Sequence, residues 1–305
     1  MRVRALRQAA AGLLCAVAFL TACSSDPAPS GQSKIAVVAS TNVYGSIAAA
    51  VGGDRITVTS FVDDPSADPH SYEATPANAA AVRAAKVVIA NGGGYDDFVG
   101  KLVADAGSNA KLIDVAELSG LKPAASGGEF NEHVWYSLPT VRKLATTLAT
   151  DLGAADPSGA ATYTANAAAF TGKLDAPQAK VDAIKAKHGG KRVAITEPVP
   201  LHLLEAAGLQ NATPEAFAEA VEQDTDPPAA VLDETLQLFT GADKVRALVA
   251  NAQTENASTK QVEQAATAGG VAIVRMTETM PAGVNDYVEW MQRQVDELSA
   301  ALDRP

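Results

Sequence analysis

Short apolar runs alternate with segments of helical spacing along the first half of the chain. The apolar runs, which we interpret as buried strands, cover residues 34–39, 56–62, 86–90 and 112–114. After the first of them, Val43, Ile47 and Val51 recur at the spacing of one helix face. Strands that alternate with helices in this way are typical of a parallel sheet covered by helices. We therefore expect an α/β lobe over residues 34–150.

The same alternation returns in the second half of the chain. It predicts strands at 192–196, 245–249 and 271–274, a helix at 201–207 and a terminal amphipathic helix at 284–302. These elements predict a second lobe over residues 191–305.

The Ala-rich segment between the two lobes has a different pattern. Apolar residues recur at roughly helical spacing from residue 157 to residue 187, which predicts one long helix. Pro177 is the weak point of this helix, because a proline removes a backbone donor and kinks or breaks the helix. The predicted fold class is therefore α/β with two lobes, each a mainly parallel sheet flanked by helices. A long interlobe helix within residues 151–190 joins them.

The first 33 residues have the features of an exported, anchored protein. Residues 1–22 predict a signal peptide, because three arginines precede an apolar run that is too short to span a bilayer comfortably. The run ends in Leu20-Thr21-Ala22-Cys23, which resembles a bacterial lipobox and predicts cleavage before Cys23 and lipid on its sulfur. The alternative is an ordinary signal peptide that contains a cysteine. Residues 23–33 predict a flexible tether, so we expect lipid anchoring on the extracytoplasmic face of the cell membrane.

Charge and cysteine content narrow the possible partners. Removal of Arg2, Arg4 and Arg7 with the signal leaves 21 of 24 Lys and Arg against 35 Asp and Glu, so the formal charge changes from −11 to −14. Such an acidic chain is a poor candidate for binding nucleic acid. The only cysteine besides Cys23 is Cys15, inside the signal, so a metal would have to be held by His, Asp, Glu or carbonyl oxygen.

Two of the four histidines lie in similar surroundings. His70 occurs in the run DPHSYE at 68–73, and His133 in the run NEHVW at 131–135, each beside carboxylates in a turn-prone segment of the first lobe. Open parallel sheets present ligand sites at the carboxyl ends of their strands. In the second lobe, Glu197 and Glu278 follow predicted strands in the same way. Neutral imidazole and carboxylate together suit Zn²⁺, Mn²⁺ and Fe²⁺.

Other residues near these motifs have possible supporting roles. Asp68, Glu73 and Glu132 are candidates for orienting the imidazoles from outside the coordination shell. His202, five residues after Glu197, is the rival ligand within a predicted helix.

A glycine-rich segment is not a phosphate-binding loop. The run NGGGY at 91–95 is not followed by Gly-Lys-Ser/Thr, so it predicts a tight turn. No P-loop is present in the sequence, so an ATPase would be a separate protein.

The two histidine motifs and the run YVEWM at 287–291 resemble the zinc/manganese-binding lipoproteins of ABC importers, the metal-specific cluster of bacterial solute-binding proteins. The resemblance implies one ion between two lobes, bound by residues that match His70, His133, Glu197 and Glu278. Glu278 departs from the family's usual Asp. The resemblance also implies capture of a metal rather than catalysis. The partners would be an ABC permease and its cytoplasmic ATPase, and we expect a monomer.

The sequence leaves the metal and two other functions open. Residues 251–254 and 278–281 resemble relatives assigned to zinc, whereas Glu197 in place of a third His and the short, His-free segment 122–128 favour manganese. The balance favours zinc, with manganese next and iron possible. The alternative functions are a zinc-dependent hydrolase, which needs a general base and an open coordination position, and a metal-binding surface adhesin.

Overall fold

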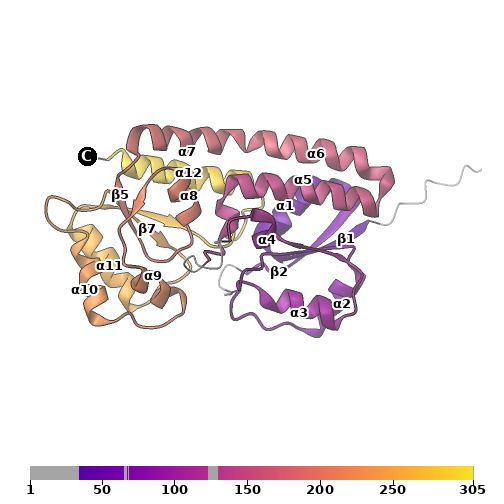
Figure 1. Ribbon diagram of the computed structural model, residues 1–305, viewed down its shortest axis with the longest axis horizontal. Coiled ribbons are helices and arrows are strands. Elements are labelled where there is room, and N and C mark those ends of the chain that lie inside the picture. The colour runs from indigo at the N-terminus through magenta and orange to yellow at the C-terminus, as the bar shows by residue number, and fades with distance from the viewer. Residues whose placement is uncertain (1–33, 65–66, 68, 123–129, 305) are drawn as a thin grey trace, which may run out of the picture. The chain divides into compact units, whose positions relative to one another are not determined.

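The strands of the computed structural model form two parallel four-stranded sheets (Figure 1). The structure describes residues 34–64, 67, 69–122 and 130–304. The first sheet has the order β2-β1-β3-β4 and the second β6-β5-β7-β8. All strand pairs in both are parallel. The strands are β1 (Ile35–Thr41), β2 (Ile56–Val62), β3 (Val87–Ala90), β4 (Lys111–Asp114), β5 (Arg192–Ile195), β6 (Gln210–Asn211), β7 (Ala247–Asn251) and β8 (Ala272–Met276). The predicted α/β class with parallel sheets is confirmed.

Helices follow most strands and cover the sheets (Figure 1). With the first sheet these are α1 (Asn42–Gly52), α2 (Pro76–Ala84), α3 (Asp97–Asp105), α4 (Val115–Ser119) and α5 (Leu138–Ala155). With the second sheet these are α8 (Leu201–Ala206), α9 (Glu215–Glu222), α10 (Ala229–Gln237), α11 (Ala257–Ala268) and α12 (Tyr287–Leu302). Single 3₁₀ turns occur at η1 (Gly53–Arg55), η2 (Val134–Tyr136) and η3 (Pro157–Gly159).

The connection between the sheets consists of two helices rather than one. α6 (Ala160–Lys173) and α7 (Asp175–His188) meet at Leu174, which keeps helical backbone angles of φ −69° and ψ −9°. The break places Pro177 in the first turn of α7. A backbone N–H in the first turn has no partner within the helix, so its absence in proline costs no helical hydrogen bond. α6 packs on α5 and α1, and α7 packs on α12. The single helix predicted over 157–187 is therefore corrected to a consecutive pair.

Capping side chains fix where several helices begin. Asp286 accepts hydrogen bonds from the backbone N–H groups of Val288 and Glu289, so α12 begins at Tyr287 rather than at the predicted residue 284. Thr75 and Asn78 form a capping box at the start of α2, with Pro76 in the first helical position.

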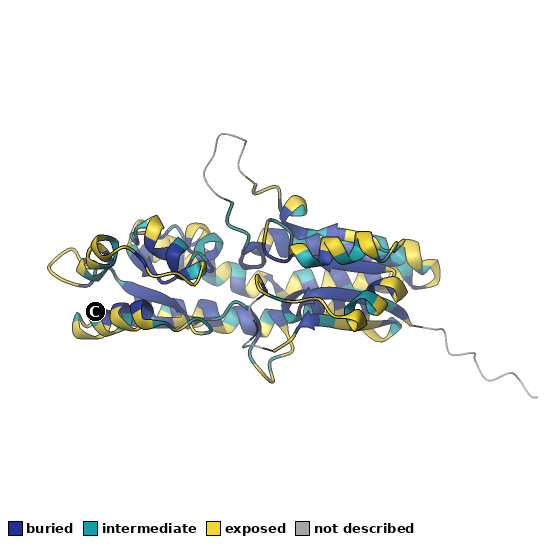
Figure 2. Cartoon of the chain, turned by 90° about the horizontal axis from the view of Figure 1, so that it is seen from below, coloured by how far each residue is buried: buried dark blue, intermediate teal, exposed yellow. Residues whose placement is uncertain are grey.

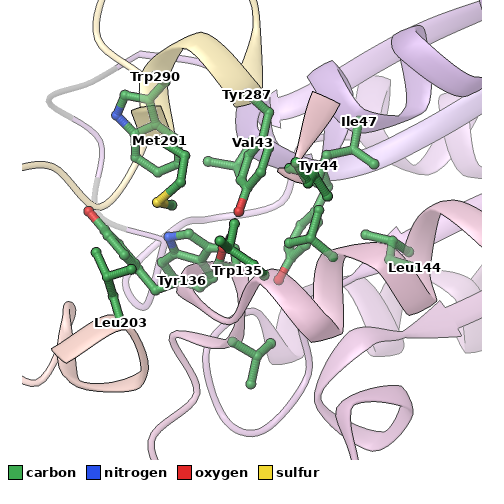
Figure 3. Packing of buried hydrophobic residues seen from close by; sticks show 14 of the residues in the cluster. Val43, Tyr44, Ile47, Trp135, Tyr136, Leu144, Leu203, Tyr287, Trp290 and Met291 are labelled. Carbon is green, nitrogen blue, oxygen red and sulfur yellow. The ribbon is translucent and has the colours of Figure 1, made fainter. Parts of the chain in front are cut away.

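An aromatic cluster joins the two halves of the structure (Figure 3). Trp135 and Tyr136 come from η2, and both are buried. The Tyr136 hydroxyl donates to the carbonyl oxygen of Thr277 at 2.6 Å, and the Tyr287 hydroxyl donates to that of Trp135 at 2.6 Å. The rings of Tyr136 and Trp290 lie 5.7 Å apart. These contacts tie the loop of His133 to α12 and to the segment after β8.

Burial follows the sheets and the inner faces of the helices, while the outer helix faces are exposed (Figure 2). The described chain from Lys34 onward belongs to one compact unit, and the predicted lobe boundaries at residues 150 and 190 stay predictions. Among the described helices, none is long and apolar enough to cross a membrane. The predicted signal peptide, the tether, Cys23 and Asp68 lie outside the described residues.

Candidate metal centre

A polar pocket of about 200 Å³ lies between loops of the two halves. All four predicted ligands, His70, His133, Glu197 and Glu278, line it. Its full lining is Ala67, Pro69, His70, His133, Glu197, Val221, Glu222, Asp224, Gln253, Thr254, Glu278 and Thr279. The loops that supply Glu197 and Glu278 follow the carboxyl ends of β5 and β8, as expected for ligand sites of parallel sheets.

A tighter group of potential ligands lies at this pocket. One nitrogen or oxygen atom from each of His70, Glu132, His133 and Glu222 can be chosen so that all lie within 4.8 Å of one another. Nε2 of His133 lies 3.6 Å from Oε1 of Glu222, and Nε2 of His70 lies 3.8 Å from Oε1 of Glu132. The structure therefore brings both predicted histidines together and adds Glu222, which the sequence analysis did not select.

The His133 ring is held in one orientation. Its side chain is 1% exposed, and its Nδ1 lies 2.8 Å from Oδ1 of Asn131. Because a carbonyl oxygen can only accept, Nδ1 carries the proton and Nε2 keeps its lone pair toward the pocket. Burial, followed by the charges of His70 and His202, lowers the pKa of His133 well below 6.5. The ring is therefore a neutral imidazole, the form that binds metals.

His70 faces the same space from a more open loop. Its side chain is 32% exposed. The ring packs edge-on against Tyr95, with the ring centres 5.0 Å apart. Its loop contains a turn in which the backbone N–H of Tyr72 donates to the carbonyl oxygen of Pro69 at 3.4 Å.

Glu222 is the last residue of α9, and its side chain is 20% exposed. A carboxylate there faces the negative end of the helix dipole, which is unfavourable unless a cation is near. Two residues later, Asp224 has a φ of 50°, the only positive φ outside glycine in the described chain. In the sequence, Glu222 comes after Phe217 and Val221, which are spaced as on one helix face and are buried in α9. The apolar pattern predicts no helix over residues 215–222, so it does not point to Glu222.

Glu197 and Glu278 line the pocket but do not belong to the tighter group. Glu197 is 3% exposed and accepts a hydrogen bond from the side-chain amide of Asn251. This partner directs the Glu197 carboxylate toward β7. Glu278 is half-buried, and its backbone N–H donates to Oε1 of Gln253 at 2.6 Å. Burial, followed by the charge of Glu278, raises the pKa of the Tyr95 phenol.

The supporting residues predicted from the sequence lie at different places relative to the pocket. Glu132 belongs to the tighter group, whereas Glu73 is exposed and does not line the pocket. His202 also lies outside the pocket lining. Its Nε2 lies 2.9 Å from the carbonyl oxygen of Asn131, an acceptor that occupies this ring nitrogen.

The donor set fits a divalent transition metal. Two imidazoles and two carboxylates would neutralise a doubly charged ion, and nitrogen and oxygen donors suit zinc, manganese and iron. The pocket also supplies more carboxylates than one such ion requires.

Curated relatives resemble this chain over part of their length. The manganese-binding lipoprotein MntA of Bacillus subtilis is 32% identical over 137 residues, 42% of this chain and 44% of the relative. The iron ABC transporter substrate-binding lipoprotein MtsA of Streptococcus pyogenes serotype M1 is 30% identical over 177 residues, 54% of this chain and 56% of the relative. The matches therefore span about half of these relatives.

Solved structures share the fold over most of the chain. The periplasmic zinc-binding protein TroA of Treponema pallidum matches with a TM-score of 0.74 and 17% identity, over 89% of this chain and 100% of the other. The protein FpvC of Pseudomonas aeruginosa in complex with Mn²⁺ matches with a TM-score of 0.71 and 22% identity, over 88% and 98%. At these identities the likeness supports the two-sheet fold alone.

A family model described as ZnuA, zinc-uptake complex component A, periplasmic, matches residues 37–301. This match confirms the resemblance inferred from the histidine motifs. Because the family is described as an uptake component, it also confirms the prediction of a binding protein rather than an enzyme. The chain belongs to the family of periplasmic zinc-uptake components.

Proposed function

We propose that this protein captures one divalent transition-metal ion outside the membrane and delivers it to an ABC permease driven by a cytoplasmic ATPase. The observation that carries the proposal is the approach of His70, His133 and Glu222 at one pocket. Imidazole and carboxylate groups from separate loops converge there without a thiol. Family membership supports the same function, as do relatives named for metal-binding transport lipoproteins.

We propose His70, His133, Glu222 and Glu278 as the four ligands. Glu222 replaces Glu197 in the set expected from the sequence, because Glu222 belongs to the group whose ligand atoms lie within 4.8 Å of one another, whereas Glu197 does not. Glu278 supplies the second carboxylate from the loop after β8. Glu132 pairs with His70 at 3.8 Å and serves as its partner before the metal binds.

Zinc is the favoured ion and manganese the next. The family description supports zinc, whereas the curated relatives are named for manganese and iron. Four ligands of nitrogen and oxygen match the tetrahedral preference of zinc. The metal content of protein purified from its native host, measured by mass spectrometry, would identify the ion.

A second cavity provides a path for the ion. It has a volume of about 640 Å³ and shares His70 and Glu222 with the metal pocket. Its lining adds the acids Glu132, Glu215 and Glu219. A cleft lined by charges of one sign raises the local concentration of ions of the opposite sign. The acids would therefore concentrate cations at the pocket.

Capture rather than catalysis follows from a closed coordination shell. With four side-chain ligands, a zinc ion has no open position for an activated water, which a zinc hydrolase requires. The aromatic contacts between η2 and α12 favour small movements between the halves, with release prompted by docking on the permease. We also propose a monomer held at the membrane by lipid on Cys23.

The experiment is a titration of metal-stripped protein followed by thermal unfolding. One equivalent of Zn²⁺ or Mn²⁺ is expected to raise the melting temperature, because an ion that binds only the folded state stabilises it. A His70→Ala/His133→Ala double variant should lose the shift. A His188→Ala variant is the matched control, since His188 pairs with Asp303 at 2.7 Å, away from the pocket. The absence of a wild-type shift, or its retention in the double variant, would contradict the proposal.

A cellular experiment separates transport from adhesion. Deletion of the gene should impair growth when metal is limiting, and added metal should restore it. An adhesion defect that added metal does not correct would support the adhesin as the primary function. Hydrolysis that depends on added Zn²⁺ would instead support the enzyme.

A further inference from the structure

Glu278 lies in a segment that is neither helix nor strand, from Thr277 to Met280, directly after β8. Buried backbone groups in such a segment need hydrogen-bond partners from elsewhere in the chain. The N–H of Thr277 donates to Oε1 of Gln294 at 3.0 Å, and its carbonyl oxygen accepts from the Tyr136 hydroxyl at 2.6 Å. The segment is therefore fixed where it leaves β8.

Gln253 holds the two peptide groups on either side of the Glu278 Cα atom. Its Oε1 accepts hydrogen bonds from the backbone N–H groups of Glu278 and Thr279, at 2.6 and 2.9 Å. Its Nε2 donates to Oγ1 of Thr279 at 2.8 Å. Because a peptide group is planar, holding both neighbours of one Cα atom restrains its two backbone angles. Gln253 thus sets the direction in which the Glu278 side chain leaves the backbone.

Gln253 is itself held beside the metal pocket. It follows β7 and lines the pocket. Its backbone N–H donates to Oδ1 of Asn251 at 3.0 Å. Since a carbonyl oxygen has two lone pairs, the two N–H groups that donate to Oε1 occupy its acceptor capacity. Gln253 therefore supports a proposed ligand rather than acting as one.

Asn42 holds the end of the same segment from the first half of the structure. It is the first residue of α1, directly after β1. Its Oδ1 accepts from the backbone N–H of Met280 at 3.1 Å, and its Nδ2 donates to the Met280 carbonyl oxygen at 2.9 Å. The Glu278 segment is therefore held from both sides of the pocket, by Asn42 on one and by Gln253 on the other.

We infer that Gln253 and Asn42 are positioning residues that hold Glu278 in its metal-binding geometry before the ion arrives. A ligand that is already in place loses less conformational freedom when it binds, so preorganisation raises affinity. This inference rests on the proposed metal capture, in which Glu278 is a ligand. Loss of either amide should weaken metal binding through Glu278.

The test is a double-mutant cycle of Gln253→Met with Glu278→Ala, in which Zn²⁺ affinity is measured by competition with a chromophoric chelator. Methionine keeps the length of the side chain but lacks the amide. Gln253→Met alone should lower affinity about tenfold, the lower end of effects seen when partners of metal ligands are removed. In the Glu278→Ala background it should have no further effect. Asn42→Leu should behave in the same way. Gln178→Met is the matched control, since Gln178 donates to Asp182 at 3.0 Å on α7, outside the pocket lining.

Co²⁺ provides a readout that a loss of stability alone would not change. The visible absorption of Co²⁺-loaded Gln253→Met should differ from that of the wild type, because a displaced Glu278 changes the coordination geometry. The control should keep the wild-type spectrum. An unchanged spectrum, or an equal loss of affinity with and without the Glu278 carboxylate, would overturn the inference. A wild type that binds neither Zn²⁺ nor Mn²⁺ would instead overturn the capture function.

A measurement on the metal-free wild type does not depend on the folding of any variant. Amide hydrogen exchange shows which backbone N–H groups are protected in the folded protein. The N–H groups of Glu278, Thr279 and Met280 should exchange slowly before metal is added. Exchange as fast as that of an exposed loop would show that the ion itself orders the segment, and would overturn the inference.

Discussion

The side-chain amide of Asn131 connects the His133 ring to the second half of the structure. Its Oδ1 lies 2.8 Å from Nδ1 of His133, and its Nδ2 donates to the carbonyl oxygen of Pro198 at 3.1 Å. The backbone carbonyl oxygen of Asn131 lies 2.9 Å from Nε2 of His202. One residue therefore sets the orientation of a proposed ligand and joins the loops on both sides of the pocket.

Replacing Asn131 by Leu should weaken metal binding. The substitution keeps the approximate shape of the side chain but removes the acceptor for His133, and loss of such a partner lowers metal affinity by about 10–100-fold. Affinity is measured by competition with a chromophoric chelator. Asn166→Leu is the control, because that amide also bridges distant segments, donating to Val51 at 3.0 Å. Equal affinities in the Asn131 variant and the wild type would show that His133 needs no such support.

Neutralising Glu222 and neutralising Glu197 should change the affinity for Zn²⁺ by different amounts. Glu222→Gln should reduce Zn²⁺ affinity by at least about 10-fold, because a charged donor to the metal becomes a neutral amide. Glu197→Gln should have a much smaller effect, since Asn251 engages one oxygen of its carboxylate and Glu197 lies outside the group of ligand atoms within 4.8 Å of one another. Isothermal titration of both variants, with exposed Glu234→Gln as the control, provides the comparison. A larger loss for Glu197→Gln would restore the ligand set expected from the sequence.

Metal-free protein should lose stability as the solution becomes acidic. The folded chain lowers the pKa of His133 well below the ordinary value of 6.5. Below pH 6.5 the unfolded chain takes up a proton at His133 that the folded chain does not, so the free energy of unfolding falls with pH. Melting temperatures from pH 7.5 to 5 should therefore fall more steeply for wild type than for His133→Gln. Parallel curves would contradict the lowered pKa.

Replacing Gly269 by alanine should lower the stability of the protein, and replacing Gly172 by alanine should raise it. At Gly269, which follows α11, an added methyl group would lie 2.2 Å from the carbonyl oxygen of Phe239. Gly269→Ala should therefore destabilise the protein by about 1–3 kcal/mol, the typical cost of overpacking. Gly172 lies within α6 with no atom near the added methyl group. Gly172→Ala should stabilise by about 0.5 kcal/mol through helix propensity. Urea unfolding measures both, and a stabilised Gly269→Ala protein would contradict this packing.

The sequence allowed prediction of the strands with strong apolar runs, because strands buried by helices on both faces are continuously apolar. β1, β3 and β7 are of this kind. β6 could not be predicted in the same way, since its two residues, Gln210 and Asn211, are polar and exposed. Its pairing with β5 depends on tertiary contacts rather than on local pattern.

The candidate site could be predicted only in part. His70 and His133 were found because each lies in a distinctive polar motif, and both line the pocket. Glu222 has no such motif, and its relevance depends on how α9 ends against the pocket, a relationship that requires the fold. Glu197 and Glu278 are predicted as ligands because each follows the end of a predicted strand. Strand ends bring residues to a pocket but do not determine which carboxylate is engaged by another side chain.

The most direct test of the proposed metal centre is anomalous X-ray diffraction from crystals of the Zn²⁺-loaded protein, recorded on both sides of the zinc absorption edge. The account predicts one strong anomalous peak in the pocket, within bonding distance of Nε2 of His133, the His70 ring and the carboxylates of Glu222 and Glu278. A peak bound by Glu197 instead of Glu222 would contradict the ligand set. A pocket with no peak at full zinc loading would contradict the metal centre itself.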